Sequence, residues 1–189
     1  MILTEATLPD ALAPLLPPLR PPGAAREDLF QRLCVRCGQC VTVCPHKCVE
    51  LAPGLFSRAR RLPRIQPGRV PCYLCMKCPP VCPTGALDSG LTDMARTRMG
   101  RAYILKNRCH NYTDGVMCMT CYDRCPLRGS AVILFDGLTP GITQACVGCG
   151  VCEYVCPVEA VAIVPASSSW VPLNAAPVLD APNNGGDGA

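Results

Sequence analysis

Short apolar segments alternate along the chain with polar segments rich in Pro and Gly. Four of them are β-prone: RVPC (69–72), RAYILKNRC (101–109), SAVILFDG (130–137) and AVAIVPA (160–166). Segments of this length predict short β-strands. We expect one helical turn after each Cys-Pro pair, because the fixed φ of proline suits the first turn of a helix. The pattern therefore predicts a small, loop-rich α+β protein.

The two ends of the chain differ from the middle. Residues 1–28 are Pro-rich and predict an extended N-terminal arm, and residues 167–189 predict a disordered tail. The longest apolar run, AVILF (131–135), is far shorter than the ~20 residues of a membrane-spanning helix. The first residues also lack the charged start and unbroken apolar stretch of an export signal. We therefore expect no membrane span and a cytoplasmic location.

Cysteine dominates the composition. The 189 residues include 17 Cys, 21 Pro and 16 Gly, whereas aromatic residues make up only 5%. Such a chain has little material for a broad apolar core, so disulfides or metal centres must substitute for it. The Cys count is odd and most neighbours are two or three residues apart, which disfavours disulfide pairing. A metal scaffold is therefore favoured over a disulfide-stapled secreted domain.

Sixteen of the Cys residues fall into four copies of one pattern. The motif C-x2-C-x2-C-x3-C-P occurs at 34–45, 72–83 and 146–157, and a fourth copy with a first gap of eight residues occurs at 109–126. The candidate iron ligands are Cys34, Cys37, Cys40, Cys44, Cys72, Cys75, Cys78, Cys82, Cys109, Cys118, Cys121, Cys125, Cys146, Cys149, Cys152 and Cys156. In the bacterial ferredoxin version of this motif, the first three Cys bind one [4Fe-4S] cube and the fourth binds its neighbour.

The repeats predict four [4Fe-4S] clusters in two ferredoxin-like modules of two clusters each, within residues 29–166. Zinc is the metal alternative, but zinc sites use two C-x2-C pairs without a recurrent third Cys and a terminal Cys-Pro. Cys48 lies outside the motifs, at the position of Ala86 and Ala160 in the second and last copies. We interpret it as a packed non-ligand, with a ligand swap or a redox role as the alternative. His46 and His110 stand beside a complete set of Cys ligands and are expected to be spectators or to act on a cluster only indirectly, by contacting its ligands.

An arginine-rich segment separates the first two motifs along the chain. It contains Arg58, Arg60, Arg61, Arg64 and Arg69, and residues 51–87 include no acidic residue. The segment is either a docking surface for an acidic partner or anionic lipid, or a solvated loop that offsets cluster charge. Four oxidised cubes add about −8 to the formal charge of +4. The resulting net negative charge disfavours nucleic acid as a partner.

The motifs resemble a known family. LRPPGA (19–24), Phe30, the first motif, CPTGALD (82–88), RMG (98–100) and the wide motif at 109–126 are similar to the NapG/MauM-type ferredoxins of nitrate-reductase and methylamine-utilisation systems. The resemblance covers residues 19–166. Two features depart from the family: no twin-arginine export signal is visible, and the middle gap of the second motif has two residues instead of four.

The resemblance implies four clusters, a periplasmic location as the alternative to the cytoplasm, and nested pairing of the motifs. Nesting joins the first motif to the last, so that Cys156 completes the cube of Cys34, and the second to the third, so that Cys125 completes the cube of Cys72. The spacing between motifs does not itself choose between nested and sequential pairing.

No Gly-rich dinucleotide loop, nucleophile elbow or His–carboxylate pair suggests substrate chemistry. The sequence therefore predicts a non-catalytic electron-transfer subunit. By resemblance, its donor is a quinol-oxidising membrane protein and its acceptor a terminal reductase or another redox enzyme. The alternative function is an accessory factor that docks on an apo-reductase during maturation.

Overall fold

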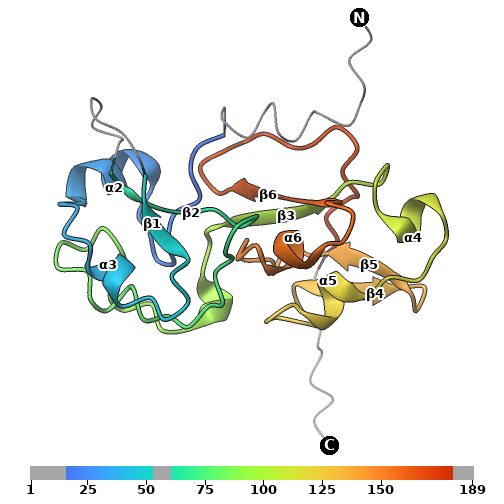
Figure 1. The fold of residues 1–189 in the computed structure, drawn as a ribbon, viewed down its shortest axis with the longest axis horizontal. Helices are drawn as coiled ribbons and strands as arrows, with labels where there is room; N and C mark the ends of the chain where they lie inside the picture. The colour runs from blue at the N-terminus through green and yellow to red at the C-terminus, as the bar shows by residue number, and fades with distance from the viewer. Residues whose placement is uncertain (1–15, 53–60, 181–189) are drawn as a thin grey trace, which may run out of the picture.

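The computed structural model describes residues 16–52 and 61–180. Its helices are α2 (Glu27–Leu33), α3 (Gln39–Thr42), the 3-10 helix η3 (Met94–Arg96), α4 (His110–Thr113), α5 (Thr120–Asp123) and α6 (Val151–Val155). Its strands are β1 (Val49–Leu51), β2 (Pro63–Ile65), β3 (Gly100–Ile104), β4 (Val132–Phe135), β5 (Thr139–Ile142) and β6 (Val161–Pro165). In Figure 1 the elements before residue 97 lie on the left and those after it on the right.

The strands form three two-stranded antiparallel sheets: β1–β2, β3–β6 and β4–β5. In the C-terminal half (residues 98–180), the β4–β5 hairpin connects the third motif to the fourth. Strand β3 precedes the third motif in the sequence, and β6 follows the fourth. These two strands pair with each other. The N-terminal half (16–52 and 61–97) repeats this plan, with β1–β2 between the first two motifs. A single bridge between Ala24 and Leu87 stands in place of the outer strand pair. Each half therefore folds two consecutive motifs against each other.

Three of the four predicted strands are confirmed as β3, β4 and β6, but the strand at residues 69–72 is wrong. The N–H groups of Arg69 and Val70 both donate to the carbonyl oxygen of Gln66, which closes a turn there. Pro71 follows without an N–H group to offer a partner strand.

The predicted helical turns are displaced. Helices α3, α5 and α6 each begin one residue before the third Cys of their motif and end before the fourth, whereas only non-helical turns follow the Cys-Pro pairs. Lys47 and Glu159, each three residues after a fourth Cys, have φ of 54° and 50°. Left-handed residues at these positions stop the turn before a helix can form.

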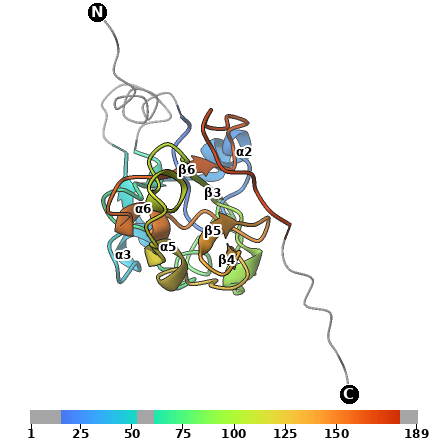
Figure 2. The ribbon, with the colours of Figure 1, turned by 90° about the vertical axis from the view of Figure 1, so that its right-hand side faces the viewer.

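The two halves pack directly against each other. The N–H of Cys72 donates to the carbonyl oxygen of Cys149 at 2.9 Å. A Cβ added at Gly150 would lie 2.3 Å from Cβ of Pro67, so only glycine fits at that contact. Apolar residues from both halves share one core, which includes Leu74 and several Cys, whereas a smaller core around Phe30 belongs to the N-terminal half. The halves therefore form one continuous body (Figures 1 and 2).

Both ends of the described chain lie against this body. The N–H of Ile65 donates to the carbonyl oxygen of Leu19 at 2.8 Å, so the described part of the Pro-rich arm is tied down. The predicted tail begins at residue 167, and its part up to residue 180 makes hydrogen bonds to the sheets instead of being disordered. The N–H of Ala176 donates to the carbonyl oxygen of Ile104, and that of Leu179 to the carbonyl oxygen of Ile142. These hydrogen bonds satisfy edge groups of the sheets. Residues 181–189 lie outside the described residues.

Over residues 16–52 and 61–180, no helix is both long enough and apolar enough to cross a bilayer.

Candidate metal centres

The structure gathers the sixteen motif Cys into four groups of four thiols, here called sites A to D. Site A is Cys34, Cys37, Cys40 and Cys82, and site B is Cys44, Cys72, Cys75 and Cys78. Site C is Cys125, Cys146, Cys149 and Cys152, and site D is Cys109, Cys118, Cys121 and Cys156. All seventeen Cys lie in the described ranges and none forms a disulfide.

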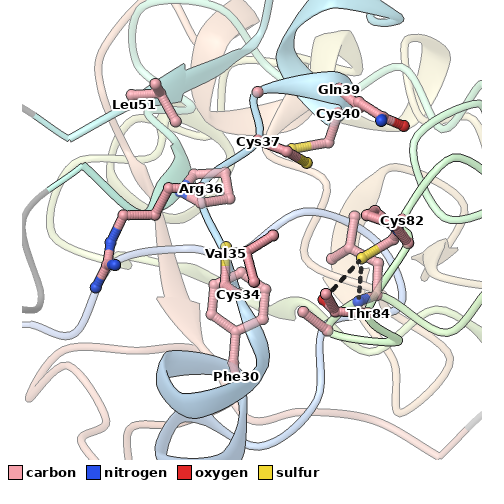
Figure 3. A pocket seen from close by; sticks show the side chains of 15 residues that line it. Phe30, Cys34, Val35, Arg36, Cys37, Gln39, Cys40, Leu51, Cys82 and Thr84 are labelled. Atoms are coloured by element: carbon pink, nitrogen blue, oxygen red, sulfur yellow. Dashed lines mark hydrogen bonds between the residues drawn. The ribbon is translucent and has the colours of Figure 1, made fainter.

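Site A surrounds a hollow open to solvent, which its four Cys line together with Phe30 and other residues (Figure 3). Burial raises the pKa of the Cys40 thiol to about 11, and the neighbouring thiolates of Cys34, Cys37 and Cys82 contribute to the rise. A fourth Cys from the second motif thus sits opposite three from the first.

Site D repeats this arrangement in the C-terminal half. Its four Cys also line one hollow that is open to solvent. Burial raises the pKa of Cys121 to about 12, with further contributions from Cys109, Cys118 and Cys156. Helix α4 lies in the eight-residue gap between the first two Cys of the third motif. The side-chain oxygen of its Asn111 accepts a hydrogen bond from the N–H of Cys118 at 3.1 Å, which brings the second Cys back toward the first.

Site B is buried where the two halves meet. Burial raises the pKa of Cys78, with contributions from the thiolates of Cys72 and Cys75. Cys44 reaches this group from the first motif: its Sγ lies 3.4 Å from Sγ of Cys48, which in turn interacts with the thiol of Cys72.

Site C is buried on the other side of the same contact. Burial raises the pKa of Cys149 to about 12, and Cys146 and Cys125 contribute. The same two thiolates act on Cys152, whose pKa is raised mainly by complete burial. Cys125 from the third motif therefore joins three Cys of the fourth.

The loops between the Cys residues are wound by left-handed residues. In the first, second and fourth motifs, the residues on either side of the second Cys have positive φ: Arg36 and Gly38, Leu74 and Met76, and Gly148 and Gly150. Leu74 and Met76 hold this conformation although a side chain there costs about 1–2 kcal/mol per residue. Strain that the surroundings maintain in this way is typical of functional loops. The Cys spacing shows the motif, but it does not show which residues turn left-handed.

Backbone N–H groups point at the Cys sulfurs. The N–H of Leu87 donates to Sγ of Cys82 at 3.3 Å, that of Ala160 to Cys156 at 3.2 Å, and that of Ala102 to Cys146 at 3.4 Å. Burial alone would raise the pKa of Cys82, but the backbone hydrogen bonds outweigh it and the pKa is lowered. Such donors stabilise thiolate sulfur and tune metal–sulfur centres. The winding of the motif loops favours such backbone donors, but the sequence does not show which N–H groups supply them.

The fourth Cys of each motif joins the three Cys of its partner motif, as the ferredoxin pattern predicts. The nested pairing implied by the resemblance is wrong in this structure, because Cys82, not Cys156, borders the hollow of Cys34. The physical reason is the hairpin between consecutive motifs: β1–β2 and β4–β5 bring neighbouring motifs together within each half.

The four sites lie in the spatial order A, B, C, D. Cys40 of site A contributes to the raised pKa of Cys78 in site B. Cys72 of site B does the same to Cys149 of site C. Cys121 of site D acts on Cys152 of site C. The two inner sites are the more deeply buried, whereas Cys37 of site A is exposed.

Of the remaining candidates, His110 lines the hollow of site D beside its Cys. His110 lies 3.0 Å from the carboxylate of Asp114, and the ring of His46 lies 4.6 Å from that of Tyr73. Arg64 pairs with Glu50 at 2.9 Å, and Arg69 lies 3.7 Å from the same carboxylate. Arg58 and Arg60 lie outside the described residues, so the arginine-rich segment as a docking surface stays a prediction.

Cys48 is buried, with 5% of its surface exposed. Ala86 and Ala160, at the equivalent positions, are buried too.

Within the described ranges, no three His, Cys, Asp or Glu side chains converge closely enough to hold one metal ion. The four thiols of site A and the four of site D instead each line a shared open hollow. A ring of four thiols with N–H donors at its sulfurs fits the ligand needs of an iron–sulfur cube.

Comparisons with known proteins agree with this chemistry. A family model described as a 4Fe-4S dicluster domain matches residues 33–86, which hold the first two motifs, and a 4Fe-4S binding domain model matches 142–162. The chain therefore carries domains that bind [4Fe-4S] clusters.

Relatives of known name match over most of the chain. It is 37% identical to the ferredoxin-type protein NapG of Escherichia coli over 159 residues, which cover 77% of this chain and 68% of the relative. It is 39% identical to the methylamine utilization ferredoxin-type protein MauM of Paracoccus denitrificans, covering 73% and 66%. For MauM of Methylobacillus flagellatus, the identity is also 39%, with coverage of 86% and 74%.

Proposed function

The chain belongs to the family of NapG and MauM ferredoxin-type proteins, and we propose that it relays electrons through four [4Fe-4S] clusters as a non-catalytic subunit. Each cube, when bound, takes up and releases one electron at a time. The protein supplies the ligands, the burial and the spacing.

Sites A and B make up one ferredoxin-like module and sites C and D the other, and each site holds one cube through its four thiolates. The observation that carries this proposal is the continuous row of four-thiol sites. The two inner sites are buried at the contact between the halves, and the two outer sites reach the surface. Burial of most Cys of the inner sites limits the access of water to them, and the less buried outer sites are suited to exchange electrons with other proteins.

The row ends in two separate outer sites, A and D. One could accept electrons from a donor and the other could pass them to an acceptor, as a relay between two partners requires. The donor in this proposal is a quinol-oxidising membrane protein, and the acceptor is a terminal reductase or another redox enzyme. The names of the relatives, a ferredoxin-type protein and a methylamine utilization ferredoxin-type protein, support a role in electron transfer.

The experiment is reduction by quinol. Holoprotein prepared without oxygen is mixed with membranes that contain a quinol-oxidising enzyme, and the reduced clusters are followed by EPR. We expect about sixteen iron atoms per chain and reduction that depends on both quinol and membranes. Clusters that stay oxidised, combined with transient binding to an apo-reductase, would instead identify an accessory factor in maturation.

A further inference from the structure

Cys48 places a fifth thiol inside site B. Its Sγ lies 3.4 Å from Sγ of Cys44, and it also interacts with the thiol of Cys72. Cys44 and Cys72 come from different motifs, so Cys48 touches the two ligands that join the first motif to the second at this site. With only 5% of its surface exposed, it makes these contacts away from water.

We propose that the Cys48 thiol shares its single S–H hydrogen bond between the ligand sulfurs of Cys44 and Cys72 and thereby raises the reduction potential of the cube in site B. The inference rests on the proposed function, since it requires Cys44 and Cys72 to be cluster ligands. A ligand thiolate carries no proton, so only Cys48 can be the donor in these contacts.

The direction of the effect follows from charge. One-electron reduction adds negative charge to a cube and its ligand sulfurs, so a donor at those sulfurs stabilises the reduced form more than the oxidised form. Hydrogen bonds to the sulfurs are among the features that set the potential of such clusters. The buried surroundings strengthen the interaction, because water does not compete for it.

The other motifs provide internal controls. The positions equivalent to Cys48 are Ala86 beside Cys82 of site A and Ala160 beside Cys156 of site D, and both are buried. A methyl group fills the same position there without an S–H donor. Backbone N–H groups reach the fourth Cys at all three sites. The extra thiol is therefore specific to site B.

The test is a redox titration of anaerobic holoprotein with dithionite, in which EPR resolves the individual clusters. Cys48→Ala should keep about sixteen iron atoms and make reduction of one cube about three- to tenfold less favourable, which is about 28 to 59 mV for one electron. Cys48→Ser retains a hydroxyl donor, and its potential should lie closer to that of the wild type. Ala86→Cys should raise the potential of a different cube, the one in site A.

Three results would overturn the inference. Four unchanged potentials in Cys48→Ala would mean that the thiol does not act on the cluster. Equal shifts in the Ala and Ser variants would assign the effect to packing. Loss of about four iron atoms in Cys48→Ala would make Cys48 a ligand. Fewer than sixteen iron atoms in the fully loaded wild type would instead count against the proposed function.

Discussion

The backbone N–H of Cys72 donates a hydrogen bond of 2.9 Å to the carbonyl oxygen of Cys149. This bond joins the second motif to the fourth, and it makes sites B and C neighbours across the contact between the halves. Sites A and B belong to the N-terminal half and sites C and D to the C-terminal half. In the order A, B, C, D, the two halves of the row therefore meet only at sites B and C.

Spin coupling between reduced clusters tests this order. Cys37→Ala with Cys118→Ala removes sites A and D, and the reduced protein should still show a coupled EPR spectrum from B and C. Cys75→Ala with Cys152→Ala removes the two inner sites, and the remaining clusters should give uncoupled signals. A coupled spectrum from the second variant would place A beside D and contradict the row.

The second prediction concerns the stability lost when Gly150, at the contact between the halves, is replaced by Ala. Gly150 and Gly38 occupy equivalent motif positions, with φ of 86° and 79°. A Cβ at Gly150 would meet Pro67 at 2.3 Å, whereas a Cβ at Gly38 would meet nothing within 4 Å. Gly38→Ala should cost about 1–2 kcal/mol of unfolding free energy from backbone strain. Gly150→Ala should cost about 1–3 kcal/mol more from the clash.

The measurement is the thermal midpoint of the holoprotein, together with the B–C coupling. Gly150→Ala should lower both, and Gly38→Ala should leave the coupling intact. Equal effects of the two substitutions would mean that Pro67 can move aside and that the halves do not depend on this contact.

A partly buried ion pair, between Arg20 and Glu27, anchors the described part of the Pro-rich arm. Arg20, 7% exposed, donates through Nε to the carboxylate of Glu27 at 2.8 Å and through a second nitrogen to the carbonyl oxygen of Pro63. Its guanidinium also lies 5.0 Å from the ring centroid of Phe30. Glu27→Gln leaves the buried cation without its counter-charge, so we expect a loss of about 1–3 kcal/mol, or several degrees in Tm.

The same pair predicts a pH dependence. Burial alone would raise the pKa of Glu27, but the hydrogen bonds from Arg20 and Gln31 outweigh it and the pKa is lowered. A lowered pKa in the folded state gives stability that is present above the ordinary carboxyl range and is lost as the pH falls through the folded value. The Tm difference between wild type and Glu27→Gln should therefore shrink below about pH 4.

The control for this prediction is the neighbouring pair of Arg26 and Asp28. Their side chains are 91% and 65% exposed and lie 3.7 Å apart, and exposed pairs contribute little. Asp28→Asn should leave Tm nearly unchanged at every pH. An equal effect of the two substitutions would remove the special role of the Arg20 pair.

The Cys spacing singled out the sixteen Cys that the structure gathers in sites A to D, whereas the secondary-structure elements around them were harder to predict. That these Cys bind clusters stays a prediction. The sequence pattern did not predict strands β2 and β5, because each contains a proline, Pro63 or Pro140, and proline is typical of turns. Strand β1 is only three residues long, too short for a periodic pattern to be visible.

The tail and the pairing could not be predicted for a related reason. Residues 167–180 are poor in local structural signals, and their order comes from hydrogen bonds to Ile104 and Ile142, which lie far away in the sequence. Motif pairing likewise depends on hairpins whose strands carry little signal. Long-range contacts decide both features, and spacing between motifs does not contain them.

Iron content tests the central claim, which is sequential pairing of the motifs, most directly. Cys34 and Cys82 share site A, so Cys34→Ala and the double variant Cys34→Ala/Cys82→Ala should both retain about twelve of sixteen iron atoms. Cys34 and Cys156 belong to different sites, so Cys34→Ala/Cys156→Ala should retain about eight. The reverse result, with about eight iron atoms in the Cys34/Cys82 variant and about twelve in the Cys34/Cys156 variant, would establish nested pairing and contradict the account.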